Sequence, residues 1–150
     1  MVDVRKGDII ELFNSPNMLT LYKEYSKESK NTLTPEIDPC EEMYVGMENL
    51  GMLDFVGAYD GDKLVGFIVA LTTTMAHYSL AATTVESFFV IEKYRKYGTA
   101  KRLLKEIESI AKEKGAVNVF MSSPIHSALH LAARAMGYTN THIIHTKKLV

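Results

Sequence analysis

Hydrophobic residues in the middle of the chain follow the spacing of β-strands. Residues 54–59 and 63–71 are rich in β-branched, aromatic and aliphatic side chains, and they flank Asp60-Gly61-Asp62. An Asp-Gly pair between two such runs predicts a β-hairpin, because glycine readily takes the positive φ that a tight turn needs. A third stretch of the same character runs from about residue 81 to residue 91. The pattern therefore predicts three consecutive antiparallel strands.

The spacing changes to that of helices after residue 98. Between residues 99 and 114 apolar side chains recur in steps of three and four, on one face of an amphipathic helix that Gly115 ends. We then expect a buried strand over residues 117–121, followed by a helix capped at Ser123-Pro124. The predicted buried residues of that helix are Ala128, Leu131, Ala132, Ala135 and Met136. A last strand is predicted from Tyr138 to Lys148.

The first fifty residues read as helical and polar. Pro16 breaks the pattern, and residues 31–40 have the composition of a loop. A second short helix is predicted from about Pro39 to Leu50, with Met43 and Met47 on its apolar stripe. The predicted order is α, α, β, β, β, α, β, α, β, without repeats. We therefore expect one α/β (α+β) domain over residues 1–150.

Composition narrows the class of protein. The chain has 150 residues, of which 47% are hydrophobic and 23% charged, which suits a globular domain rather than a disordered chain. No apolar run approaches the roughly 18 residues of a membrane span, and the N-terminus lacks the apolar stretch of a signal peptide. The single cysteine, Cys40, excludes an internal disulfide framework. We expect a soluble, cytoplasmic protein without a membrane partner.

The net charge of −1 conceals an uneven distribution. Residues 1–87 hold 6 Lys/Arg and 14 Asp/Glu, whereas residues 88–150 hold 11 Lys/Arg and 4 Asp/Glu. This division fits an anionic ligand at the C-terminal part and a cationic ligand at the N-terminal part. It also fits a simple excess of charge on solvated faces.

The junction between the third strand and the long helix has the features of an anion site. In Val90-Ile-Glu-Lys-Tyr-Arg-Lys-Tyr-Gly98-Thr-Ala100 a strand ends, and after a short connection Gly98 opens the helix. Backbone N–H groups at a helix start lack intrahelical partners, so they can bind a pyrophosphate where small residues leave them accessible. Four basic residues surround this point: Arg95, Lys96, Lys101 and Arg102. The Walker pattern of nucleotide hydrolases and the Gly-rich dinucleotide fingerprint are absent.

The segment Arg95-Lys-Tyr-Gly98-Thr-Ala100, read as Arg/Gln-x-x-Gly-x-Gly/Ala after a strand, resembles the acyl-CoA motif of the GNAT superfamily of N-acetyltransferases. Gly137-Tyr138 stands at the position expected later in the chain, and the order of elements matches across residues 1–150. The resemblance implies a central mixed, mostly antiparallel sheet, flanked by about four helices. It also implies acetyl-CoA as co-substrate, transfer of an acetyl group to a primary amine, and no metal.

The resemblance also implies where acetyl-CoA lies. The sheet would splay between the strand that ends near Val90 and the strand over residues 117–122, with the pantetheine arm in the opening. The pyrophosphate would lie on the amides of residues 96–101. The implied CoA-binding residues are Phe89, Val90, Ile91, Arg95, Lys96, Tyr97, Gly98, Thr99, Ala100 and Lys101.

Glu86 is the predicted general base. It is the only carboxylate in the strand that precedes the motif, and its four-residue spacing to Val90 predicts that both side chains lie on one face of the sheet. A carboxylate beside the thioester could deprotonate an ammonium group, directly or through water. The alternative is a structural Glu paired with a lysine or with a backbone amide.

The residue at the expected position of the general acid departs from the GNAT pattern. Many members have a tyrosine four residues before the glycine of a Gly-Phe/Tyr pair, and here that position is Ala133. Among Tyr78, His77 and Tyr138, we select Tyr78 as catalytic and His77 as substrate-binding. His126 and His130 are four residues apart, but no glutamate lies near them in the helix, so we predict no metal site.

Acidic residues in the N-terminal part predict a cationic acceptor. Glu41 and Glu42 open the second helix, which borders the acceptor cleft in the GNAT family, and Glu36 and Asp38 precede it. The acceptor amine would belong to a small molecule, a protein or a peptide. A homodimer is compatible with the sequence. The alternative function is a catalytically weak module that binds CoA as a sensor or protein-docking scaffold. We expect no nucleic-acid partner, because the basic cluster is compact.

Overall fold

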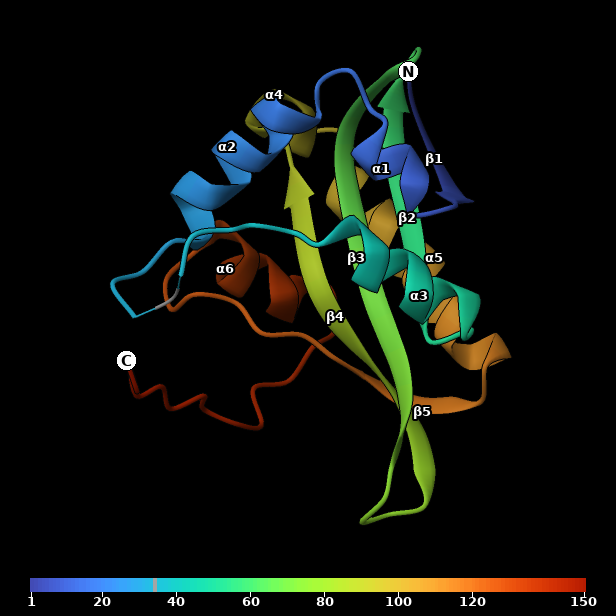
Figure 1. Ribbon diagram of the computed structural model, residues 1–150, viewed down its shortest axis with the longest axis vertical. Coiled ribbons are helices and arrows are strands. Elements are labelled where there is room, and N and C mark those ends of the chain that lie inside the picture. Colours follow the sequence, from blue (N-terminus) through green and yellow to red (C-terminus); the bar gives the residue numbers. More distant parts are fainter. Residues whose placement is uncertain (34) are drawn as a thin grey trace.

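The computed structural model describes residues 1–33 and 35–150. Its core is a five-stranded sheet in the order β1-β2-β3-β4-β5 (Figure 1). The strands are β1 (Val2–Gly7), β2 (Leu53–Asp60), β3 (Lys63–Met75), β4 (Leu80–Val90) and β5 (Ala116–Phe120). The helices are α1 (Ile10–Phe13), α2 (Met18–Ser29), α3 (Glu41–Asn49), α4 (Glu92–Arg95), α5 (Thr99–Glu113) and α6 (Ala128–Ala135). Residue 34, in the predicted loop, lies outside the described residues.

The sheet is mixed and mostly antiparallel, as the resemblance implied. β1, β2, β3 and β4 pair antiparallel in sequence order, and β4 pairs parallel with β5. Helices α1, α2 and α3 cover one face, and α5 lies behind the other (Figure 1). Each face therefore has its own cluster of buried side chains, one around Leu103 and Ile107 of α5 and the other around Phe67 and Phe55.

The β2–β3 hairpin is confirmed where it was expected. Asp60 pairs with Lys63, and Gly61 between them has a φ of 59°. A side chain with a Cβ is disfavoured at that φ, so glycine is the residue that this two-residue turn requires.

Helix α5 also follows its sequence pattern. Leu103, Leu104 and Ile107 are almost fully buried against the sheet. Each such side chain contributes about 1.5–3 kcal/mol through removal of its apolar surface from water. The amphipathic face thus fixes the orientation of α5 and, with it, the position of Gly98 at the N-terminus of the helix.

Strands β4 and β5 diverge after a short ladder. Their pairing runs from Ala81 with Ala116 to Thr84 with Phe120. From Val85 to Val90, β4 has no strand partner on its β5 side among the described residues. Backbone groups along this edge are therefore available to a ligand, because a β-strand without a neighbour leaves N–H and C=O groups unpaired.

The N-terminal segment differs from the prediction. Residues 2–7 form an edge strand paired with β2, where the sequence was read as helical. The signal was short, since only Val2 and Val4 alternate with polar residues. Within α3, Met47 packs against the core as predicted, together with Tyr44 and Val45. Met43 is 64% exposed, so its predicted place on the buried stripe is wrong.

The C-terminal segment differs most. β5 is confirmed but largely exposed rather than buried, because no described strand covers its outer side. Helix α6 begins at Ala128, and the side chain of Ser127 caps it by accepting a hydrogen bond from the His130 N–H at 3.1 Å. Of its residues only Ala133 is buried, and Leu131 is 70% exposed.

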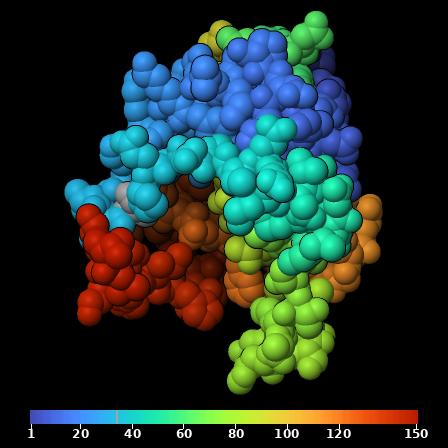
Figure 2. Space-filling model, in the orientation of Figure 1, coloured from blue at the N-terminus to red at the C-terminus, as the bar shows by residue number. Residues whose placement is uncertain are grey.

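No strand forms over residues 138–148, so that prediction is wrong. The only aliphatic residues of the segment, Ile143 and Ile144, are adjacent rather than alternating, and both are more than 70% exposed. Figure 2 shows the segment as a separate lobe below residues 36–40 of the α2–α3 connection, with a hollow between them. Among the described residues, no helix is long and apolar enough to cross a membrane.

Candidate functional site

Glu86 lies in a β-bulge of strand β4. Ser87 pairs with Val69 and Val85 pairs with Ala70, so Glu86 is the additional residue of β4 at this point. A bulge bends the strand and changes the direction of its side chains, which is why bulges are common beside active sites.

The bulge overturns the expectation that Glu86 and Val90 share a face. Val90 packs in the cluster that α5 covers, whereas Phe89 packs in the cluster beneath α2. The Glu86 carboxylate accepts a hydrogen bond from Tyr44, which packs against the second cluster. An inserted residue breaks the two-residue alternation, so counting in even steps fails across it.

A small, partly open cavity lies beside the exposed side chain of Glu86. Its volume is about 210 Å³, and its wall comes from α2, the α2–α3 connection, α3 and β4. The lining residues are Tyr22, Tyr25, Ile37, Asp38, Pro39, Tyr44, Glu86 and Ser87. The Tyr44 hydroxyl donates to Glu86 Oε1 at 2.6 Å, and Oε2 has no hydrogen-bond partner among the described residues. The hydrogen bond from Tyr44 thus orients the carboxylate of Glu86.

The three tyrosines of this cavity stay protonated at neutral pH. Burial is the main cause that raises the pKa of Tyr22, Tyr25 and Tyr44, and the negative charge of Glu86 raises it further. The effect of Glu86 on all three pKa values reflects how closely their hydroxyl groups surround the carboxylate. The cavity therefore presents neutral phenol groups and aromatic rings beside the carboxylates of Glu86 and Asp38.

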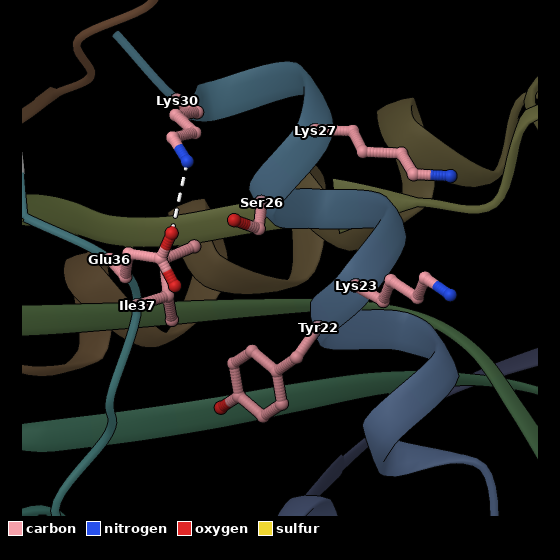
Figure 3. A pocket seen from close by; sticks show the side chains of 7 residues that line it. All are labelled: Tyr22, Lys23, Ser26, Lys27, Lys30, Glu36 and Ile37. Atoms are coloured by element: carbon pink, nitrogen blue, oxygen red, sulfur yellow. Dashed lines mark hydrogen bonds and ion pairs between the residues drawn. The ribbon is translucent and has the colours of Figure 1, made fainter. Parts of the chain in front are cut away.

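A second cavity of about 370 Å³ adjoins the first, because Tyr22 and Ile37 line both. Lys30 Nζ and Glu36 Oε1 form an ion pair of 3.0 Å across it (Figure 3). Lys23 and Lys27 point to the other side of α2, away from Ile37 (Figure 3). The space beside Tyr22 is thus polar and open to solvent.

The N-terminus of α5 is open to an anion. Gly98 is the N-cap, has a left-handed φ of 70°, and no side chain caps the helix. A Cβ built on Gly98 would meet no protein atom within 4 Å. The first N–H groups of α5 are therefore without a capping side chain, and the space beside Gly98 is open, as a pyrophosphate site requires.

The connection from β4 to α5 is held by several hydrogen bonds. The Tyr94 hydroxyl donates to Asp60 Oδ2 at 2.7 Å, and the buried Thr99 hydroxyl donates to the Tyr94 carbonyl at 2.9 Å. Arg95 donates from Nε to the Val90 carbonyl at 2.8 Å and from Nη2 to Glu28 at 2.7 Å. Arg95 thus ties α4 to α2, while Lys96, Tyr97 and Lys101 are exposed around Gly98.

The sequence-predicted proton donors do not lie near Glu86. Tyr78 and His77 are at the tip of the β3–β4 hairpin, where Met75 pairs with Leu80. Six residues of strand separate this tip from Glu86, about 20 Å at the rise of a β-strand. The Tyr138 hydroxyl donates to Glu108 of α5 at 3.0 Å, on the opposite face of the sheet.

Only some of the acidic residues of the N-terminal part line a cavity. Asp38 lines the cavity of Glu86 and Glu36 lines the adjoining one. Glu41 and Glu42 are exposed in the first turn of α3 and line neither cavity. No group of three or more metal-binding side chains occurs in the part of the chain that the structure describes.

Sequence reasoning did not assign the three tyrosines to the site. Tyr22 and Tyr25 are three residues apart, so one face of α2 carries both, and this was the available signal. No local pattern indicated Tyr44, because its contact with Glu86 joins residues 42 positions apart in the chain.

Comparisons with known proteins give a family match for most of the chain. A family model, described as the acetyltransferase (GNAT) family, matches residues 16–138. No curated protein sequence gives a significant match to the chain.

Solved structures share the fold at low sequence identity. A ribosomal-protein-alanine N-acetyltransferase from Brucella melitensis biovar Abortus 2308 has a TM-score of 0.74 at 16% identity, with 99% of each chain covered. An aminoglycoside acetyltransferase from an uncultured soil metagenomic sample, in complex with sisomicin, has a TM-score of 0.77 at 14% identity, over 99% of this chain and 96% of that one. Glucosamine-6-phosphate N-acetyltransferase from Arabidopsis thaliana has a TM-score of 0.76 at 13% identity, over 100% of this chain and 99% of that one.

Proposed function

Because the chain belongs to the GNAT acetyltransferase family, we propose that it transfers the acetyl group of acetyl-CoA to a primary amine, with Glu86 as general base. One observation carries the proposal: the free edge of β4 connects the cavity of Glu86 to the uncapped start of α5 at Gly98. Val90 is four residues along the strand from Glu86, a span of about 13 Å. An extended pantetheine arm suits such a path between a thioester and a pyrophosphate.

Different residues would hold different parts of acetyl-CoA. The edge of β4 near Phe89, Val90 and Ile91 would pair with the amide groups of the pantetheine arm. The N–H groups at the start of α5 would bind the pyrophosphate, and exposed Lys96 and Lys101 would add positive charge. Acetyl-CoA supplies the acetyl group as a thioester.

The chemistry proceeds by direct attack. Glu86 Oε2 takes a proton from the acceptor ammonium, directly or through water, and leaves a neutral amine. The nitrogen then forms a bond with the thioester carbonyl carbon, the C–S bond breaks, and the thiolate of CoA leaves and takes up a proton. The nitrogen loses its second proton, and an amide remains.

A role as a CoA-binding module without catalysis is the second candidate. The observation that favours it is Ala133, which is buried and has no proton to donate. A thiol has a pKa near 8.5, so a thiolate leaves readily without a general acid. For that reason we favour the enzyme.

Thiol release tests the two functions. The protein is incubated with acetyl-CoA and a panel of primary amines, free thiol is measured, and calorimetry measures the affinity for CoA. Release that depends on an amine supports the enzyme. Tight CoA binding without release for any amine contradicts it and supports the binding module.

Charge around α3 should influence the KM for the acceptor and not the KM for acetyl-CoA. We expect Glu41→Lys combined with Glu42→Lys to raise the KM for a cationic amine and to leave the KM for acetyl-CoA nearly unchanged. Both side chains are exposed, so the effect should shrink with added salt, which screens such charges beyond about 10 Å at 0.1 M. Glu41→Gln with Glu42→Gln is the matched control and should show a smaller change. Equal changes in both KM values would mean that this segment is structural.

A further inference from the structure

The cavity of Glu86 has three aromatic walls and two carboxylates. We propose that it holds the acceptor as a slender aliphatic ammonium group, enclosed by Tyr22, Tyr25 and Tyr44 and directed at Glu86. The inference rests on the proposed function, because it names the class of amine that this site would acetylate. It excludes amines attached directly to a bulky ring.

The charges of the cavity favour a cation. Glu86 and Asp38 both line it, and neither forms an ion pair with any described residue. The lining includes no lysine, arginine or histidine. An ammonium group would therefore supply the positive charge that these two carboxylates lack.

The aromatic rings favour an ammonium group in particular. Tyr22 and Tyr25 come from α2 and pack against Phe67, with ring centroids 6.1 and 5.9 Å from it. Tyr44 packs against Phe13 at 5.7 Å. These contacts hold the three rings of the lining in place. Aromatic faces attract ammonium groups through the ring quadrupole, and more strongly where water is partly excluded.

The size of the cavity favours a slender group. Its 210 Å³ is about 40% more than the roughly 150 Å³ of a cavity that admits benzene. A primary ammonium on a few methylene groups fits this volume with room to spare, whereas an amino sugar with its ring substituents would take up most of it. The rest of the acceptor would extend past Tyr22 and Ile37 into the adjoining cavity.

Binding of choline, a probe that cannot be acetylated on nitrogen, tests the site without turnover. The probe is titrated into the CoA-saturated protein by calorimetry, beside its neutral carbon isostere 3,3-dimethylbutan-1-ol. We expect choline to bind about ten-fold more tightly than the isostere, because only choline has the charge that the rings and carboxylates attract. Equal affinity of the two probes would overturn the proposal.

Substitutions at Tyr22 test the aromatic contribution. Tyr22→Leu should weaken choline binding by about three- to thirty-fold, the range of a cation–π contact. Tyr22→Phe keeps the ring and should retain most of the affinity. Thermal unfolding measures whether each variant is folded. If a variant does not fold, the comparison of choline with its isostere on the unchanged protein still tests the proposal. Equal loss in both variants would contradict a role of the ring.

A panel of acceptors tests the substrate class. Nα-acetyl-lysine amide and 1,4-diaminobutane carry the same slender arm, and they separate a peptide acceptor from a free diamine. We expect either to be acetylated with a kcat/KM at least about ten-fold above that of glucosamine. Preference for glucosamine overturns this inference and leaves the proposed function intact. Selective choline binding without acetylation of any amine supports the ammonium site and contradicts the proposed function.

Discussion

Glu86→Gln is expected to lower kcat/KM for acetyl transfer by about 10²–10⁴ at neutral pH, the usual contribution of a general base. Glutamine keeps the volume of the side chain and can still accept a hydrogen bond from Tyr44, so the fold should persist. The affinity for acetyl-CoA should change little, because the proposed phosphate contacts lie at the start of α5. Thiol release and calorimetry measure the two quantities separately.

The pH dependence of this deficit identifies the role of Glu86. Above about pH 10, near the pKa of a lysine-type amine, the acceptor loses its proton without help, so the deficit should narrow. Glu113→Gln is the matched control, because Glu113 is exposed near the end of α5 and forms no ion pair with a described residue. Turnover of Glu86→Gln within a few-fold of the unchanged protein at neutral pH would assign Glu86 a packing role.

Gly98→Val is expected to remove most of the affinity for acetyl-CoA. The Cβ would enter space that the protein leaves empty beside Gly98, at the start of α5 where the pyrophosphate is proposed to bind. The left-handed φ of Gly98 adds strain of about 1–2 kcal/mol for a residue with a Cβ. Calorimetric titration with CoA measures the loss of affinity.

Gly115→Val separates backbone strain from blocked binding. Gly115 follows the other end of α5, has a φ of 79°, and also has no protein atom near its Cβ position. Both variants should therefore lose similar stability in denaturant unfolding, and only Gly98→Val should lose CoA affinity. Normal CoA binding by Gly98→Val would show that the pyrophosphate does not lie at this helix start.

The sequence by itself determined the elements whose signals are local. The β2–β3 hairpin follows from Asp-Gly between two apolar runs, and α5 follows from apolar residues in steps of three and four. The Gly98 junction was recognisable for the same reason, because a glycine between the end of a strand and the start of an amphipathic helix is a pattern of a few adjacent residues. The family follows from that junction, and the match over residues 16–138 agrees with it.

Only the tertiary structure decided the direction of Glu86 and the composition of its surroundings. The bulge arises from the pairing of β4 with β3, and the contact with Tyr44 joins residues 42 positions apart. The C-terminal segment was predicted as a strand, but it forms none, and its Ile143 and Ile144 are exposed. Periodicity reports which face of an element is apolar, whereas bulges, strand partners and cavities depend on contacts between distant segments that no local pattern encodes.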